Sequence, residues 1–208
     1  MGELVFECVD VVPDRYAAAP TLLFRLRIRE LTETPVQAVA LRCQIRVEPR
    51  KRRYSAAEAE RLLDLFGEPS RWSDTLRPMQ FAYVDKLIPG FVGQTEVDLP
   101  VVCTYDLEVA AGRHFSALEG GEIPLLLLFS GTVFYGGPQG FTVEQIPWHN
   151  EAAYRLPVRV WQELMDIHFP GSGWLRRETI DRLGKFKAGR ALPTWDDALN
   201  ALLDLIPP

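Results

Sequence analysis

The sequence lacks any long hydrophobic run. A helix that spans a membrane needs about 18 or more consecutive apolar residues, whereas the most apolar segments, LPVVC and IPLLLLF, are far shorter. The first ten residues have neither the basic start nor the apolar stretch of a secretory signal. Phe6 stands where an N-myristoylation motif has Ser or Thr. We therefore expect a cytoplasmic protein with no membrane span.

Cysteine and histidine are scarce, with three of each among 208 residues. Cys8, Cys43 and Cys103 are widely spaced and odd in number, so they fit neither a disulfide framework nor a CxxC metal site. We expect all three to be small buried hydrophobic residues; a metal site assembled from three strands is the alternative. We predict no metal ion and no other cofactor.

Catalytic motifs are missing as well. The sequence contains no GxxxxGK(S/T) phosphate loop, no GxSxG serine motif and no HExxH zinc motif. Cys103 and His114 do not form a recognisable nucleophile–base frame, and Ser130 lies in FSGTVFY. We therefore predict that the protein is not an enzyme and has no catalytic residue. An enzyme with a pocket near Cys103, His114 and Ser130 is the alternative.

Basic residues are outnumbered by acidic ones, and the net charge of −5 argues against a general nucleic-acid-binding protein. Residues 22–53 nevertheless hold nine Lys or Arg and only three acidic residues. Strict alternation in residues 22–29 and 39–47 predicts two strands, each with one buried and one solvent face, joined by a turn at Pro35. If these strands pair, five arginines share the solvent face. They are Arg25, Arg27, Arg29, Arg42 and Arg46.

This arginine face has several interpretations. It is a solvated sheet face, a face docked on the protein's own acidic helices, or a site for an acidic partner segment or for RNA phosphates. No aromatic residues interleave with the arginines to stack on bases. Among binding partners, an acidic protein segment is therefore favoured over RNA.

The rest of the chain mixes strands with helices. A capping box at Ser55–Glu58 begins a predicted helix, and residues 95–105 alternate as a strand. Residues 107–119 carry a helical stripe of apolar residues. We predict an α+β fold: an antiparallel sheet covered by helices in residues 1–150, with a helical extension, residues 151–208, packing on it. A β-sandwich with a helical tail is the alternative, and it requires residues 107–119 to be a strand.

Residues 123–135, IPLLLLFSGTVFY, are nearly all apolar. Such a segment is either a central strand covered on both faces or a strand whose second face is an interaction surface. We predict an apolar groove that takes a hydrophobic segment of a partner protein. The helix around Trp161 would act as a gate, and the arginine face would steer acidic partners. The predicted groove residues are Leu125, Leu127, Phe129, Val133 and Tyr135.

Between residues 4 and 135 the order of elements resembles that of the export chaperone SecB and its fold relatives. The resemblance is carried by the opening strand FECVDV, the segments LLFRLRIR and VALRCQIRV, the stretch LPVVCTY before an alanine-rich helix, and the exit strand GEIPLLLLFSGTVF. It implies a SecB-like layout and a chaperone-like role.

The whole chain also resembles an uncharacterised actinobacterial family. Its members share blocks similar to LRCQIRVEP, RWSDTLRP, LPVVCTYDLEVA and LLFSGTVFY, and they are often encoded near nickel–iron hydrogenase genes. This resemblance implies an accessory or assembly role with a hydrogenase-related partner. We accordingly predict a non-enzymatic protein that binds an apolar or acidic segment of a partner protein, and a homo-oligomer is compatible with this role. A structural subunit of a larger complex is the alternative.

Overall fold

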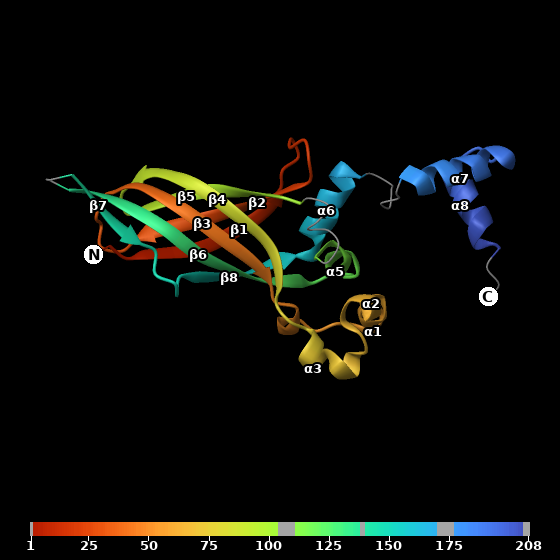
Figure 1. Cartoon of the computed structure of the whole chain (residues 1–208), viewed down its shortest axis with the longest axis horizontal. Coiled ribbons are helices and arrows are strands. Elements are labelled where there is room, and N and C mark those ends of the chain that lie inside the picture. Colours follow the sequence, from red (N-terminus) through yellow and green to blue (C-terminus); the bar gives the residue numbers. More distant parts are fainter. Residues whose placement is uncertain (1, 104–110, 138–139, 170–176, 206–208) are drawn as a thin grey trace. The chain divides into compact units, whose positions relative to one another are not determined.

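The computed structural model describes residues 2–103, 111–137, 140–169 and 177–205. The chain divides into two compact units, Met1–His168 and Phe169–Pro208 (Figure 1). The predicted boundary at residue 150 is therefore wrong. Strand β8 (Glu151–Pro157) pairs with β6 (Glu122–Gly137), and helix α6 (Val158–His168) follows β8 directly, so both elements belong to the first unit.

Two antiparallel sheets build the first unit. Sheet A has the strand order β1-β2-β5, and sheet B has the order β4-β3-β6-β7, with β8 also paired to β6. The strands of sheet A are β1 (Leu4–Pro13), β2 (Thr21–Glu30) and β5 (Gln94–Val102). The further strands of sheet B are β3 (Val36–Val47), β4 (Met79–Phe91) and β7 (Gly140–Gln145). The predicted combination of antiparallel sheet and helices in an α+β chain is confirmed.

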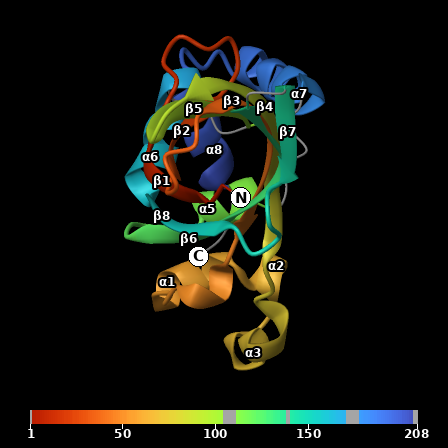
Figure 2. The same ribbon diagram turned by 90° about the vertical axis from the view of Figure 1, so that its left-hand side faces the viewer.

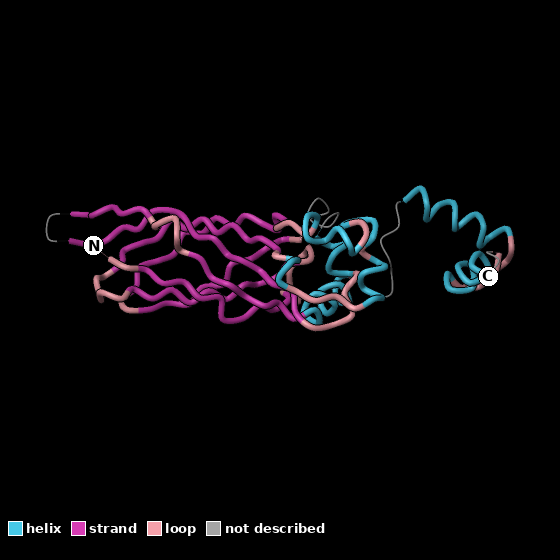
Figure 3. The backbone as a smooth tube through the Cα atoms, turned by 90° about the horizontal axis from the view of Figure 1, so that it is seen from below, coloured by secondary structure: helices cyan, strands magenta, loops and turns pink. Residues whose placement is uncertain are grey.

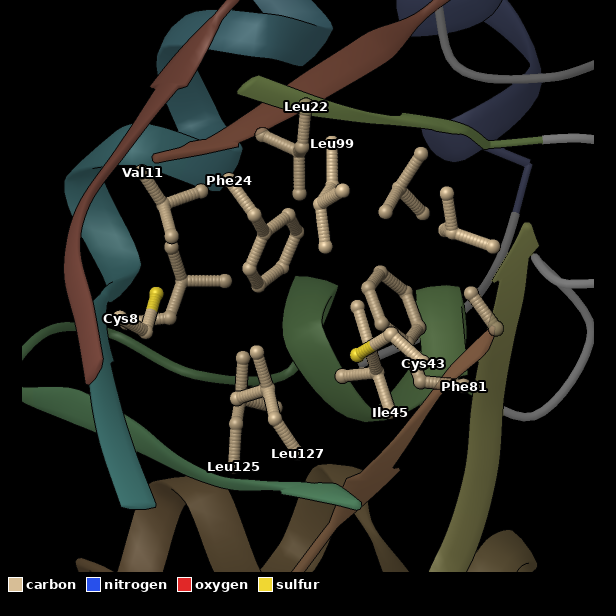
Figure 4. Packing of buried hydrophobic residues seen from close by; sticks show 14 of the residues in the cluster. Cys8, Val11, Leu22, Phe24, Cys43, Ile45, Phe81, Leu99, Leu125 and Leu127 are labelled. Carbon is tan, nitrogen blue, oxygen red and sulfur yellow. The ribbon is translucent and has the colours of Figure 1, made fainter. Parts of the chain in front are cut away.

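The hydrophobic core lies between the two sheets, which surround it when seen along the strands (Figure 2). Phe6 of β1 stacks on Phe129 of β6 with ring centroids 4.4 Å apart, and Phe24 of β2 contacts Phe81 of β4 at 6.5 Å. Cys8 and Cys43 point into this core from opposite sheets (Figure 4). The prediction that the cysteines are buried hydrophobic residues is confirmed. The main cover of each sheet is thus the other sheet, whereas helices were expected there.

Strands β2 and β3 do not pair, contrary to the premise of a shared arginine face. β2 lies between β1 and β5, and β3 lies between β4 and β6. The link between them crosses from one sheet to the other. The buried Glu30 carboxylate stabilises this crossing, because it accepts hydrogen bonds from the backbone amides of Glu3 and Thr34 at 3.0 and 2.8 Å.

The helices of the first unit gather at one end of the strands (Figure 3). They are α1 (Ala56–Arg61), α2 (Leu63–Phe66), α3 (Trp72–Thr75), α5 (Arg113–Ser116) and α6. Two 3-10 turns accompany these helices: Pro49–Lys51 precedes α1, and Pro69–Arg71 lies between α2 and α3. The predicted capping box is present at the start of α1. Of the predicted helix 107–119, residues 107–110 lie outside the described residues.

The second unit contains α7 (Arg177–Gly189) and α8 (Trp195–Leu203). Thr194 begins α8 with a capping box, in which the Asp197 amide donates to the Thr194 hydroxyl at 3.1 Å. The Lys187 ammonium lies 5.8 Å from the centre of the Trp195 ring, which joins the two helices. Among the described helices of either unit, none is long and apolar enough to span a membrane.

Candidate protein-binding face

The predicted groove residues face the interior. Leu125, Leu127, Phe129, Val133 and Tyr135 are each no more than 4% exposed. Trp161, the predicted gate, is also buried, and its ring packs edge-on against Phe115 at 5.0 Å. The prediction of a groove lined by these side chains is therefore wrong. They form part of the core because the odd-numbered side chains of β6 point toward sheet A.

The predicted arginine face is divided between the outer surfaces of the two sheets. On sheet A, Arg25 pairs with Asp98 at 3.1 Å, and Arg27 pairs with Glu96 at 2.9 Å and Glu7 at 3.2 Å. These acidic partners stand on β5 and β1, the two neighbours of β2.

The arginines of sheet B are paired as well. Arg42 contacts Asp85 at 2.7 Å and Arg46 contacts Glu48 at 3.7 Å. The hydrogen bond from Arg42 lowers the pKa of Asp85. Arg29 is exposed, and the described residues offer it no ion pair. The local positive charge of the sequence is thus largely balanced across neighbouring strands.

The outer face of sheet B carries an uncharged, mostly apolar stripe instead. The strand register sets Leu87, Ala40, Thr132 and Gln145 in one cross-strand row, and Pro89, Ala38, Phe134 and Val143 in the next. Leu87 is 71% exposed, Val143 is 55% exposed, and Phe141, near the start of β7, is 74% exposed. We call these nine residues the outer stripe. Large exposed apolar patches of this kind mark interaction sites.

A shallow hollow of about 450 Å³ adjoins the outer stripe. Ala40 and Leu87 of the stripe line it together with Arg42, Asp85 and Gly131. Gly131 has φ of +133°, and a Cβ atom there would lie 2.0 Å from the carbonyl oxygen of Ala40. Only glycine therefore lets β6 approach β3 this closely.

Strand β7 has a free edge, because in the described part of the chain it pairs with β6 alone. The Ile146 amide donates to the Gly131 carbonyl at 2.9 Å. Antiparallel hydrogen bonding alternates along a strand, so the backbone groups of Phe141, Val143 and Gln145 point away from β6. The same three side chains lie on the outer face. Trp148, which is 91% exposed, follows shortly after this edge.

Polar groups are buried elsewhere, where the helices meet β6. Arg52 forms a short hydrogen bond of 2.5 Å with Glu58, and their side chains are only 8% and 4% exposed. Burial alone would raise the pKa of Glu58, but hydrogen bonds from the Ser55 and Glu119 amides, with Arg52, lower it overall. Arg52 also donates to the carbonyl oxygens of Gly120 and Glu122, at 2.8 and 2.9 Å.

His114 lies beside this ion pair and is fully buried. Its Nε2 is 3.0 Å from the Tyr54 hydroxyl, and burial, together with the Arg52 charge, lowers the pKa of His114 to about 4. Ser130 is exposed on the outer face of sheet B, whereas Cys103 is buried. The three residues of the alternative enzyme pocket therefore do not share an open cleft. The described residues also contain no cluster of metal-ligating side chains.

The sequence over residues 1–206 matches a protein family described as a family of unknown function, DUF6084. The chain belongs to the DUF6084 family. This agrees with the expected membership in an uncharacterised family. No curated protein matches this DUF6084 sequence.

Three solved structures show a distant likeness to this DUF6084 protein. A late embryogenesis abundant protein is 12% identical, with 76% of this chain and 72% of that chain covered and a TM-score of 0.30. A β-glucosidase from Kluyveromyces marxianus is 6% identical, with 74% and 15% covered and a TM-score of 0.26. β-Glucosidase 3B from Thermotoga neapolitana is 9% identical, with 74% and 17% covered and a TM-score of 0.25. The chain thus spans about a sixth of each β-glucosidase, and these scores carry no functional argument.

The outer stripe could not be predicted from the sequence, because its residues come from four different strands. Phe141 and Val143 do alternate in the segment FTVEQ, and Leu87 continues the alternation of Tyr83 and Asp85. The order of strands in the sheet, which brings these residues into two rows, is not visible in either segment alone.

Proposed function

We propose that this protein is a non-enzymatic accessory protein that binds an apolar segment of a partner protein on the outer face of sheet B. The observation that carries the proposal is the outer stripe, an uncharged apolar surface that crosses β4, β3, β6 and β7. The role is chaperone-like or that of an assembly factor, and it is exerted in the cytoplasm. The resemblance to SecB favours the chaperone-like role, and the resemblance to a family encoded near hydrogenase genes favours a hydrogenase-related partner.

The chemistry of the surface defines the partner segment. The two cross-strand rows of the stripe contain no charged residue. They would therefore remove water from a charged partner segment without offering it an opposite charge. The nearest ions, Arg42 and Asp85, already pair with each other. An apolar segment avoids this cost, and each fully buried large side chain contributes about 1.5–3 kcal/mol to binding.

The test is co-purification from the native host with two matched variants. Val143→Ser changes the stripe on β7, and Val102→Ser changes a similarly exposed valine on sheet A, at 55% and 47% exposure respectively. We expect wild type and Val102→Ser to recover the same partner, and Val143→Ser to lose most of it. The partner is then identified by mass spectrometry and its affinity is measured with purified protein.

A second pair of variants tests the arginines. Because Arg25 and Arg27 are paired within the chain on sheet A, we expect Arg25→Gln and Arg27→Gln to leave partner recovery unchanged. Equal recovery by wild type and Val143→Ser would overturn the proposed binding face. Loss of recovery only with the arginine variants would assign binding to the charged outer surface of sheet A instead.

A further inference from the structure

The free edge of β7 is open to another strand. Phe141, Val143 and Gln145 direct backbone donors and acceptors away from β6, as the hydrogen bond from Ile146 to Gly131 fixes the alternation. Natural edge strands are commonly protected by charged side chains, especially lysine, by proline or by a bulge, and β7 carries one such charge, Glu144. Residues 140–145, GFTVEQ, contain neither lysine nor proline, and the pairing of β7 with β6 has no register shift.

We propose that β7 pairs antiparallel with β7 of a second copy of this chain, with the two-fold axis at Thr142. This inference rests on the proposed function, because it extends the same outer stripe. Only residues with outward backbone groups can form the hydrogen-bonded pairs between the copies. With the axis at Thr142, Phe141 of each copy therefore faces Val143 of the other copy. The two most exposed apolar side chains of β7 thereby cover each other.

Charge favours the same register. With the axis at Thr142, Glu144 faces Gly140 of the second copy, so no two like charges stand opposite each other. An axis at Glu144 would place two carboxylates in direct opposition, which is destabilising. An axis at Val143 would oppose the two Val143 side chains but set Phe141 against Gln145, so the largest apolar side chain of β7 would lose its apolar partner. Thr142 is therefore the position where self-pairing suits both the apolar and the charged side chains.

The pairing has a consequence for the binding face. Directly opposed residues of an antiparallel pair lie on the same face of the sheet, so the outer faces of both copies point in one direction. The two outer stripes then join across β7 into one continuous apolar surface. The contact between the copies is small, and we expect a dimer that dissociates on dilution.

Disulfide trapping tests the register directly. At the two-fold axis, Thr142 faces itself as a non-hydrogen-bonded pair, for which the Cα atoms lie about 4.5 Å apart, within the range of a disulfide. The native cysteines are buried, so the full-length Thr142→Cys variant adds one accessible thiol. We expect mild oxidation to give a covalent dimer at least ten times faster than it does for Glu144→Cys, on the same face of the strand. Equal rates for the two variants would overturn the register.

Light scattering on the untagged wild-type chain over a range of concentrations provides a second measurement. We expect a rise from monomer to dimer mass, and its loss in Val143→Lys. A monomer at all concentrations would sink the self-pairing. A monomer that still recovers the partner through the outer stripe would leave the proposed function standing, whereas a dimer that recovers no partner would overturn the proposed function alone.

Discussion

His114 makes the stability of the first unit depend on pH between 7 and 5. The side chain is fully buried, and its pKa falls from 6.5 to about 4 because burial, and then the Arg52 charge, disfavour the imidazolium ion; Glu58 opposes the shift. The unfolded chain therefore binds a proton at a pH where the folded chain does not. Stability is complete above the unfolded pKa and is lost as the pH falls from 6.5 toward 4.

The magnitude follows from the two pKa values. Between pH 7 and pH 5, the difference in proton binding lowers the free energy of unfolding by about 2 kcal/mol. The assay is urea denaturation followed by tryptophan fluorescence at both pH values. We expect His114→Gln, which keeps a polar group near Tyr54, to remove most of this loss even where it lowers stability at pH 7. His149→Gln, at an exposed position, serves as the control and should keep the wild-type difference. The same loss in wild type and His114→Gln would refute the reasoning.

Five other substitutions separate the roles of buried and exposed groups in the same urea assay. Glu58→Ala should lower the free energy of unfolding by about 3–5 kcal/mol because it leaves Arg52 buried and unpaired, whereas Arg61→Ala, which breaks an exposed ion pair with Glu119 at 3.0 Å, should cost at most about 1 kcal/mol. Gly131→Ala should cost at least about 2 kcal/mol, because the new Cβ meets the neighbouring strand. Phe129→Ala should cost about 3–5 kcal/mol, and Phe141→Ser at most about 0.5 kcal/mol; similar costs for these last two would contradict the assigned faces of β6 and β7.

Much of the fold could be predicted from the sequence where the pattern is local. The alternation in residues 22–29 and 39–47 correctly predicts strands, and the capping box at Ser55 correctly predicts a helix start. Strand pairing could not be predicted in the same way. Each strand has two edges with equivalent backbone groups, so adjacency along the chain favoured a hairpin, while the structure pairs β2 and β3 with other strands.

The groove residues could not be assigned from the sequence for a different reason. The sequence does not show which face of β6 points into the core. Residues 125–128 are four consecutive leucines, so composition does not tell which face turns inward. The outward leucines, Leu126 and Leu128, are half-buried, and their odd-numbered neighbours are buried. The same uncertainty does not arise for β3, where Arg42 and Arg46 alternate with buried residues and mark the outer face.

β6 owes this ambiguity to its place in the sheet. One edge of the strand pairs with β3 over most of its length, while the other edge pairs first with β8 and then with β7. Its inner side chains hold the core against sheet A, and Phe134 on its outer side connects Ala38 to Val143 within the outer stripe. A strand with these two tasks needs apolar residues on both faces. We therefore expect substitutions on the inner face of β6 to lower the free energy of unfolding. Substitutions on its outer face should instead reduce partner recovery and leave the free energy of unfolding unchanged.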